Sequence, residues 1–531
     1  MGASGTATGP GMPLRGDRIL RYVNAFCPAC HSAQAGSGGA PGTPLADVRR
    51  LSGWLVERGG RVWLERGCPT HGLVRTLYDE DPAILAWLEQ WTAPTKAHTP
   101  DSPGNFDPVP GAYLRGLGEM QTQHTCILLA DIVEACNLRC PTCFAGSAPG
   151  LGGAVAVADV LANVDARLAR ENGRLDVLML SGGEPTLHPA LPQLLAELVA
   201  RPIVRILVNS NGIRIARSDA LLDLLTEHRE RVEVYLQFDG LRAETVRHHR
   251  GADVQALKLA AIRRLSARQI FTTLVMTAAL GVNDDEIGDV VRVALDTRYV
   301  GGVCIQPQFS SGRSGALDPL DRLTHTGVLA RLGPQTGGLV TWRDLTALPC
   351  SHPHCCSVGY LIRDDAAEWR SLVALVGPDR LKARLGLAAN RIADDELPRE
   401  VAAAVRESLL GLLSEQSSLS HPRIGDLWRD ICRNCDLGMQ TLLTLATGAV
   451  PGRRGRLREL LAGRVKRITV KPFMDIHTML EERLTQCCVH VGTRSAGQDQ
   501  CAPFCAVQAW APLGAQKLPS GARALPLVER T

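Results

Sequence analysis

The sequence predicts an α/β protein whose central part is an open parallel barrel of six βα units, preceded by a small metal-binding domain and followed by a cysteine-rich domain. Short apolar runs with the length of strands alternate with amphipathic stretches of helical periodicity along the middle of the chain. These runs are 126–133, 177–181, 204–209, 232–238, 270–276 and 302–306. Close pairs and triplets of cysteine on either side of the barrel predict metal or cluster ligation.

The length of 531 residues is enough for about two to four domains. A Gly-, Ala- and Pro-rich start predicts a disordered tail, and repeated prolines after position 92 predict a linker. We expect a tail over 1–16, a rubredoxin-like metal-binding domain over 17–92, a linker over 93–117, the barrel core over 118–340, an auxiliary cluster domain over 341–510 and a second tail over 511–531.

The composition narrows the classes of function. The formal net charge of +4 is small for this length and gives no reason to expect a nucleic-acid partner. Charged residues and proline interrupt the longest apolar runs, so no segment is expected to span a bilayer. The N-terminus lacks the apolar stretch of a signal peptide, which predicts a cytoplasmic protein. In such a chain the 17 cysteines indicate metal ligation rather than disulfides.

Two short knuckles define the N-terminal domain. Their spacing, with a hairpin-sized insert between them, resembles a rubredoxin or zinc-ribbon site, with Cys27, Cys30, Cys68 and His71 as the four ligands of one zinc or iron. His31 competes for the fourth position. A metal that stabilises the small fold is favoured over an electron-transfer centre, because such metals usually supply folding energy.

A loop with three cysteines follows the first predicted strand of the barrel. Cys136, Cys140 and Cys143 are spaced Cx3Cx2C, and three thiolates on so short a loop can hold three irons of a cubane and leave the fourth iron free. A free iron can chelate S-adenosylmethionine (SAM), and one electron from the cluster then yields a 5′-deoxyadenosyl radical. These cysteines are therefore the predicted catalytic residues. A zinc knuckle is the alternative, but zinc requires four ligands.

The second predicted strand leads into a Gly-Gly-Glu-Pro turn. Gly182 and Gly183 let the backbone approach a ligand closely, and Glu184, before Pro185, offers an acceptor for the aminoacyl end of SAM. Together the cluster loop and this turn resemble the radical SAM enzymes. The resemblance implies a partial (βα)6 barrel, a [4Fe-4S] cluster with SAM, and an electron donor such as a ferredoxin or flavodoxin.

Polar residues also follow the third and fourth predicted strands. In parallel barrels the chemistry takes place at the carboxyl ends of the strands. Asn209, Ser210 and Gln237 lie at these ends, where the ribose and adenine of the cofactor need hydrogen bonds. We therefore expect them to bind the cofactor.

Nine cysteines in three groups follow the barrel. Our assignment places one auxiliary [4Fe-4S] cluster on Cys350, Cys355, Cys432 and Cys435, and another on Cys487, Cys488, Cys501 and Cys505. Cys356 then has no cluster to bind. A structural zinc is the alternative for either group, because spacing alone does not separate zinc from iron–sulfur ligation.

The cysteine layout as a whole resembles one subfamily, the tetraether lipid synthase group, whose members are also described as dihydropterin methyltransferases. The motifs that carry the resemblance are CPxC at 27–30, CPxHG at 68–72, CNLxCPxCFA at 136–145, PCSHPxC at 349–355 and PFC at 503–505. The resemblance implies coupling of alkyl chain ends of membrane lipids by an enzyme peripheral to the membrane.

Three activities stay open: lipid carbon–carbon coupling, methylation of a pterin or other small molecule, and peptide maturation. A non-enzymatic iron–sulfur scaffold is disfavoured because it would not need the Gly-Gly-Glu-Pro turn. A long cavity lined by Leu, Val, Ile and Phe would favour the lipid, whereas a short polar pocket would favour the small molecule, whose donors and acceptors need buried partners.

Overall fold

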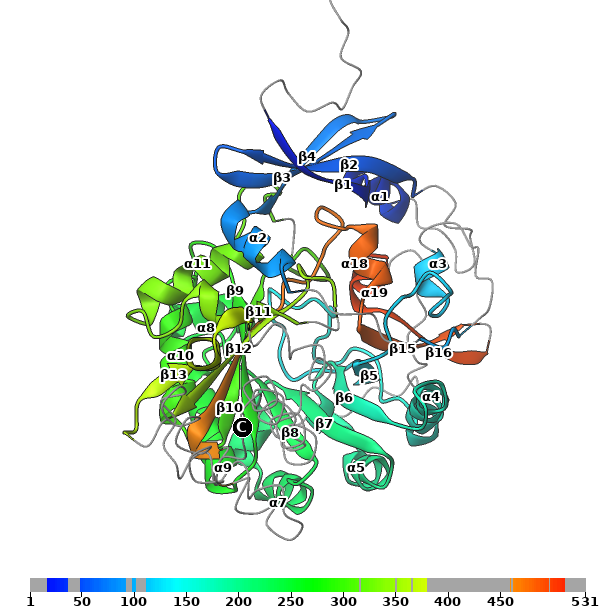
Figure 1. Cartoon of the computed structure of the whole chain (residues 1–531). Helices are drawn as coiled ribbons and strands as arrows, with labels where there is room; N and C mark the ends of the chain where they lie inside the picture. The colour runs from blue at the N-terminus through cyan, green and yellow to red at the C-terminus, as the bar shows by residue number, and fades with distance from the viewer. Residues whose placement is uncertain are drawn as a thin grey trace, which may run out of the picture.

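The computed structural model describes residues 17–36, 48–91, 98–101, 111–314, 317–348, 351–363, 366–379, 459, 462–495 and 497–510. It contains a four-stranded sheet and a twelve-stranded sheet. Figure 1 shows the small sheet, in blue, covering one end of the barrel that the large sheet forms.

The small sheet is an antiparallel meander of four strands. Its strands are β1 (Arg18–Phe26), β2 (Arg50–Arg58), β3 (Arg61–Cys68) and β4 (Gly72–Asp79). The turn between β2 and β3 is Gly59-Gly60, and both glycines have positive φ, as a two-residue hairpin turn requires. Helix α1 (Pro28–Gly36) follows β1, and α2 (Pro82–Glu89) follows β4.

Six parallel strands form the barrel, and the six predicted apolar runs correspond to them. The strands are β5 (Ile127–Val133), β6 (Leu175–Gly182), β7 (Ile203–Ser210), β8 (Val232–Gln237), β9 (Thr272–Ala278) and β10 (Val300–Pro307). They pair in sequence order, each parallel to the next. The predicted α/β fold with an N-terminal ribbon is confirmed.

Helices cover the outer face of these strands. They are α4 (Val157–Arg170), α5 (Leu191–Val199), α6 (Ile213–Arg217), α7 (Asp219–Glu227), α9 (Gln255–Ala267), α10 (Ile287–Asp296) and α11 (His325–Gln335). Helix α8 (Ala243–Arg250) packs instead on the loop after β5, where Val246 belongs to one buried cluster with Leu138 and Cys140. In α10 the buried residues Ile287, Val290, Val291 and Ala294 recur at the spacing of one helix face, which packs on the barrel. Two short 3₁₀ turns cover Pro185–Leu187 and Trp342–Asp344.

The chain beyond the barrel adds strands to both edges of the same sheet (Figure 1). At one edge β14 (Val465–Val470) pairs parallel to β10, and β12 (Ser357–Arg363), β11 (Thr346–Ala347) and β13 (Trp369–Ser371) follow it. At the other edge β15 (Val489–Ser495) pairs parallel to β5 and antiparallel to β16 (Gln498–Pro503). Four more helices lie in the described residues: α3 (Gly111–Leu114), α12 (Leu372–Val376), α18 (Glu481–Thr485) and α19 (Phe504–Trp510).

Most residues of the barrel strands are buried because both faces of these strands are covered. One large buried cluster packs the outer face of the strands against the helices, and a second fills the barrel interior and extends to α18 and α19. In the part of the chain that is described, no helix is long and apolar enough to cross a membrane.

The pairing of β14 with β10 depends on Gly302. A Cβ at this position would lie 2.0 Å from the backbone oxygen of Arg467 on β14. We therefore expect Gly302→Ala to lower the free energy of unfolding by about 2 kcal/mol, the usual cost of forcing extra atoms into packed structure. Denaturant titration of the purified chain measures this change.

Gly333→Ala is the matched control, since its Cβ would meet nothing closer than Thr341 Cγ2 at 3.8 Å. Gly333 lies inside α11, where alanine favours helix formation. We expect its stability to be unchanged or slightly higher. Equal losses in both variants would contradict the role assigned to the close approach at Gly302.

Candidate active site and metal centres

The three predicted catalytic cysteines lie together in the loop after β5. Cys136, Cys140 and Cys143 all line one cavity at the carboxyl end of the barrel. Arg313, which the sequence analysis did not single out, holds this loop: its Nε donates to Cys140 O at 3.0 Å, and its backbone N donates to Cys143 O at 2.9 Å. Its position after the sixth strand offered no sequence signal for this contact.

The Gly-Gly-Glu turn packs directly on the strand that leads into the cluster loop. Gly183 N donates to Val133 O at 2.6 Å, and Glu184 N donates to Ala135 O at 3.0 Å. Gly182 has φ +114°, and a Cβ on Gly183 would lie 2.1 Å from Ala135 O. Only glycine fits at both positions, so the two motifs hold each other in place through their backbones.

Glu184 organises the loop after β7. Its carboxylate is buried and accepts hydrogen bonds from Thr186 Oγ1 at 2.7 Å, Ser210 Oγ at 2.9 Å and Asn211 N at 2.8 Å. Burial raises the pKa of Glu184, although these hydrogen bonds act in the opposite direction. Asn211, which was not predicted, donates through Nδ2 to Asn137 Oδ1 in the cluster loop at 2.7 Å. Three loops are thereby connected around one carboxylate.

The other predicted cofactor-binding residues, apart from Pro185, line the same cavity. Gln237 Nε2 donates to Asn209 Oδ1 at 2.8 Å, and Asn209 and Ser210 stand beside Gly182 and Gly183 in the cavity wall. Pro185 is buried at the start of a 3₁₀ turn behind this wall. These polar side chains and the three thiols surround one space, and this set of groups fits a [4Fe-4S] cluster with bound SAM.

A buried ion pair closes one side of the cavity. Arg250, at the end of α8, donates through Nε to Asp239 Oδ2 at 2.6 Å and through Nη2 to Gln237 Oε1 at 3.0 Å. Burial alone would raise the pKa of Asp239, but the charge of Arg250 outweighs it and lowers that pKa to about 2. The sequence did not predict a role for Arg250 in the cavity, because a basic residue in the last turn of a helix is usually solvated.

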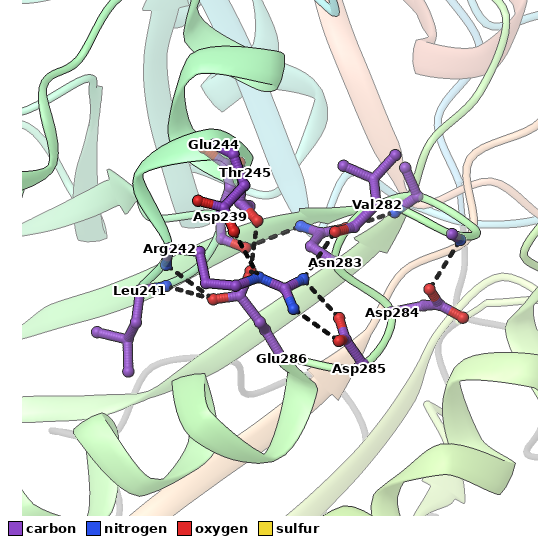
Figure 2. Close-up of polar contacts among 12 residues, drawn as sticks. Asp239, Leu241, Arg242, Glu244, Thr245, Val282, Asn283, Asp284, Asp285 and Glu286 are labelled. Carbon is purple, nitrogen blue, oxygen red and sulfur yellow. Dashed lines mark hydrogen bonds and ion pairs between the residues drawn. The ribbon is translucent and has the colours of Figure 1, made fainter.

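The loop between β9 and α10 holds the segment that begins at Asp239 (Figure 2). Asn283 Nδ2 donates to Asp239 O and to Thr277 O, each at 2.8 Å. Glu286 accepts from the backbone N of Leu241 at 2.7 Å and of Arg242 at 2.9 Å, where α8 begins. The segment that carries Asp239 and Arg250 is therefore held from outside the cavity.

Another part of the cavity wall comes from the ends of β9 and β10 and from the loop after β10. Thr277, Gln306, Gln308, Phe309 and Ser314 line it, and Phe144 from the cluster loop lies beside them. The cavity with its open mouth has an empty volume of about 840 Å³. It offers amide and hydroxyl groups together with two aromatic rings.

The four predicted ligands of the N-terminal domain also come together. The ligand atoms of Cys27, Cys30, Cys68 and His71 all lie within 4.8 Å of one another. His71 Nδ1 is 3.5 Å from Cys27 Sγ and 3.4 Å from Cys30 Sγ. This donor set fits one tetrahedral metal ion. His31 is turned away, with Nε2 at 2.6 Å from Ala509 O.

The C-terminal cysteines are described in part. Cys350, Cys432 and Cys435 lie outside the described residues, so the first predicted auxiliary cluster is represented by Cys355. In the second predicted set, Cys501 and Cys505 have different surroundings. Cys501 Sγ accepts from Arg167 Nη1 at 2.8 Å, whereas Cys505 Sγ accepts from Met474 N at 3.3 Å.

Family comparisons agree with this geometry. Residues 131–294 match the radical SAM superfamily, and this span includes the cluster loop and the Gly-Gly-Glu turn. The chain contains a radical SAM domain. Residues 19–80 match the HMPTM N-terminal zinc ribbon domain, which includes the four ligands of the small sheet.

Three individual proteins illustrate the similarity. A 7,8-dihydro-6-hydroxymethylpterin dimethyltransferase of Methanocaldococcus jannaschii is 23% identical over 485 residues, which are 86% of this chain and 90% of that protein. The subtilosin biosynthesis protein AlbA of Bacillus subtilis is 26% identical over 150 residues, 28% of this chain and 32% of AlbA. A solved radical SAM methyltransferase from Sphaerobacter thermophilus has 15% identity and a TM-score of 0.30, covering 56% of this chain and 75% of that one.

The cysteines of the cluster loop are tested by joint substitution. Replacing Cys136, Cys140 and Cys143 by Ala removes the three thiolates, so about four irons per chain should be lost. Reductive cleavage of SAM, measured as 5′-deoxyadenosine, should cease. Cys126→Ala is the control, because Cys126 directly precedes β5 and does not belong to the cluster loop. This variant should keep both its iron content and its SAM cleavage. SAM cleavage in the triple variant would refute the assignment.

The ribbon ligands are tested by comparing two histidines. His71→Ala should remove about one metal ion per chain, because a structural site needs its fourth ligand. His31→Ala should retain the metal, since His31 contacts a backbone oxygen instead. Metal analysis of the purified full-length variants decides between the two, and loss of the metal from His31→Ala alone would reverse the assignment.

Proposed function

We propose that this radical SAM enzyme forms a carbon–carbon bond at a carbon of a small polar heterocycle, and that methylation of a pterin or a related compound is its reaction. The observation that supports this proposal most directly is the character of the cavity wall that β9, β10 and the loop after β10 form. Gln306, Gln308, Thr277 and Ser314 bring several donors and acceptors to one place. The pterin dimethyltransferase that aligns over most of this chain supports the same substrate class.

The cavity suits a flat heterocycle in a second respect. Phe144 and Phe309 stack with ring centroids 6.0 Å apart and an interplanar angle of 29°, and both line the cavity. Aromatic faces bind flat rings, while amide groups satisfy their polar edges. Within the lining described, Leu138, Phe144 and Phe309 are the only members of the set Leu, Val, Ile and Phe. The lining therefore favours the small molecule over a long alkyl chain.

When bound, the cluster with SAM supplies the 5′-deoxyadenosyl radical that abstracts a hydrogen atom. The chain's own residues hold and orient the reactants. Cys136, Cys140 and Cys143 would ligate the cluster, and Asn209 and Gln237 would hydrogen-bond the nucleoside. An external donor such as a ferredoxin or flavodoxin would deliver the electron. The ribbon would hold one zinc or iron, and auxiliary clusters would lie in the C-terminal region.

Coupling of alkyl chain ends of membrane lipids is the second candidate. It is favoured by the aromatic rings that continue from the cavity into the C-terminal region. Phe473 lies 5.6 Å from Phe309 and 4.4 Å from Phe504, ring centroid to centroid. An alkyl chain could pack on this apolar surface, and the enzyme would then work at the surface of a membrane.

The two candidates are separated by an anaerobic assay with reconstituted enzyme, SAM and a chemical reductant. We expect a reduced hydroxymethylpterin to increase 5′-deoxyadenosine formation and to gain methyl groups, as detected by mass spectrometry. Coupled alkyl products from a lipid extract, with no change in the pterin, would establish the second candidate. No product from either substrate would overturn both.

A variant in the cavity wall tests the contact itself. Gln308→Leu removes an amide that would pair with the heterocycle, so methylation should fall by about tenfold or more. SAM cleavage without substrate should persist, since Gln308 does not belong to the predicted cofactor-binding residues. Gln269→Leu is the matched control because Gln269 lies after α9, away from the cavity lining.

A further inference from the structure

The loop after β10, residues 308–314, contributes one set of side chains to the cavity. Gln308, Phe309 and Ser314 line the cavity, and Gln308 Nε2 donates to Ser314 Oγ at 2.9 Å. Gln308 N also donates at 2.8 Å to Ala278 O, at the end of β9. Both ends of this loop therefore belong to the part of the wall that we assign to the substrate.

The same loop holds the cluster loop with a second set of contacts. Arg313 donates through Nη1 to Gly146 O at 2.5 Å and through Nη2 to Ser147 O. These bonds add to those that Arg313 makes with Cys140 O and Cys143 O. The planar guanidinium carries five donors in a fixed arrangement. A single side chain thus binds carbonyl groups on both sides of Cys143.

The backbones of the two loops also lie in close contact. Gly312 has φ +56°, and a Cβ at this position would lie 2.4 Å from Phe144 O. Ser311 Oγ donates to the same oxygen at 3.4 Å. Three successive residues thus join the loop after β10 to the cluster loop, and displacement of one loop would disturb the other.

Asp475 fixes the loop after β10 from the C-terminal region. Its carboxylate is buried, and Oδ2 accepts from Ser310 N at 2.9 Å and from Arg322 Nη2 at 2.8 Å. Arg322 Nη2 also lies 3.4 Å from Gln308 O. The other oxygen, Oδ1, accepts at 3.0 Å from His477 N, in the segment between β14 and α18. Asp475 therefore joins this segment to the loop that carries Arg313.

The charge of Asp475 strengthens this connection. Burial alone would raise the pKa of its carboxyl group, but the charge of Arg322 and the hydrogen bonds from Arg322 and Ser310 lower that pKa. Asp475 is therefore ionised, and its hydrogen bond from Ser310 N is charge-assisted. Such hydrogen bonds are roughly twice as strong as neutral ones, so this contact is suited to hold a loop in place.

We infer that Asp475 is a positioning residue for the radical cluster, and that it acts through residues 308–314, whose Arg313 transmits its hold to the cluster loop. The ability of the cluster loop to bind SAM then depends on the packing of the segment between β14 and α18 against the barrel. This role needs only the radical SAM domain, so it can be tested whatever the substrate is.

Hydrogen–deuterium exchange of the full-length chain, reconstituted anaerobically with iron and sulfide, tests this role. Asp475→Asn keeps the shape of the side chain and removes its charge. We expect the amides of residues 136–147 to exchange about tenfold faster, and the dissociation constant of SAM to rise by about the same factor, as for the loss of one hydrogen bond to a charged group.

Glu233→Gln is the matched control. Glu233 is also buried and paired with an arginine, with Oε1 at 3.1 Å from Arg205 Nε, but the pair lies near the amino ends of β7 and β8, whereas the loop after β10 lies at a carboxyl end. We expect this variant to keep both values, and an unchanged circular dichroism spectrum would show that each variant is folded. Unchanged values in folded Asp475→Asn, or equal changes in both variants, would overturn the inference.

Arg313→Met tests the path from Asp475 to the cluster loop. Arg313 is only partly buried, so this variant should fold even if Asp475→Asn does not. Exchange in residues 136–147 should rise, and Asp475→Asn should add little in this background, because the two residues act in series. Coupling between sites is reciprocal, so exchange should also rise at His477 and Thr478, whose amides donate to Asp475. Additive effects, or unchanged exchange at these two amides, would contradict transmission through Arg313.

Discussion

The rest of the site depends on the close approach of two backbones, the Gly-Gly-Glu turn and the strand before Cys136. Any side chain on Gly183 would collide with Ala135 O, and hydrogen bonds from Gly183 N and Glu184 N join the two segments. This contact sets the distance between the thiols and the carboxylate of Glu184. Because Glu184 then binds Ser210 and Asn211, the position of the third loop follows from the same contact.

Buried charges around the cavity form a second constraint. Lys258 on α9 is fully buried, and its Nζ donates to Asn211 O at 3.3 Å and also to Gln237 O. Burial, together with the charge of Arg250, lowers the pKa of Lys258 to about 8, whereas Asp239 acts in the opposite direction. Lys258 and Arg250 thus share a small volume with the buried carboxylates of Asp239 and Glu184. Buried polar groups need partners in fixed positions, and Asn283 in the β9–α10 loop fixes the backbone at Asp239 (Figure 2).

The N-terminal ribbon is joined to the barrel through the C-terminal region. Arg66 is buried and donates to Phe26 O at 2.7 Å and to His477 O at 3.0 Å. Tyr78 OH lies 2.8 Å from His354 Nδ1. A metal that stabilises the ribbon therefore also stabilises the surface on which residues 472–488 pack. Loss of that metal would therefore destabilise this surface as well as the small sheet.

Local spacing was enough to predict much of this protein. Cys136, Cys140 and Cys143, like Cys27, Cys30, Cys68 and His71, come from short segments whose geometry is set by a loop or a hairpin, so their residue spacing already specifies a site. The six barrel strands were likewise predictable, because strands buried on both faces are rich in apolar residues.

The tertiary structure decided whatever depends on contacts between distant segments. Arg250 could not be identified from its own helix, since its partners Asp239 and Gln237 are brought to it by the barrel. Cys501 and Cys505 are four residues apart, yet β16 directs one toward Arg167 and α19 holds the other near Met474. Sequence alone therefore determined the thiols and the histidine whose local spacing specifies a site. The tertiary structure decided which distant residues meet them, because long-range packing leaves no periodic signal in the chain.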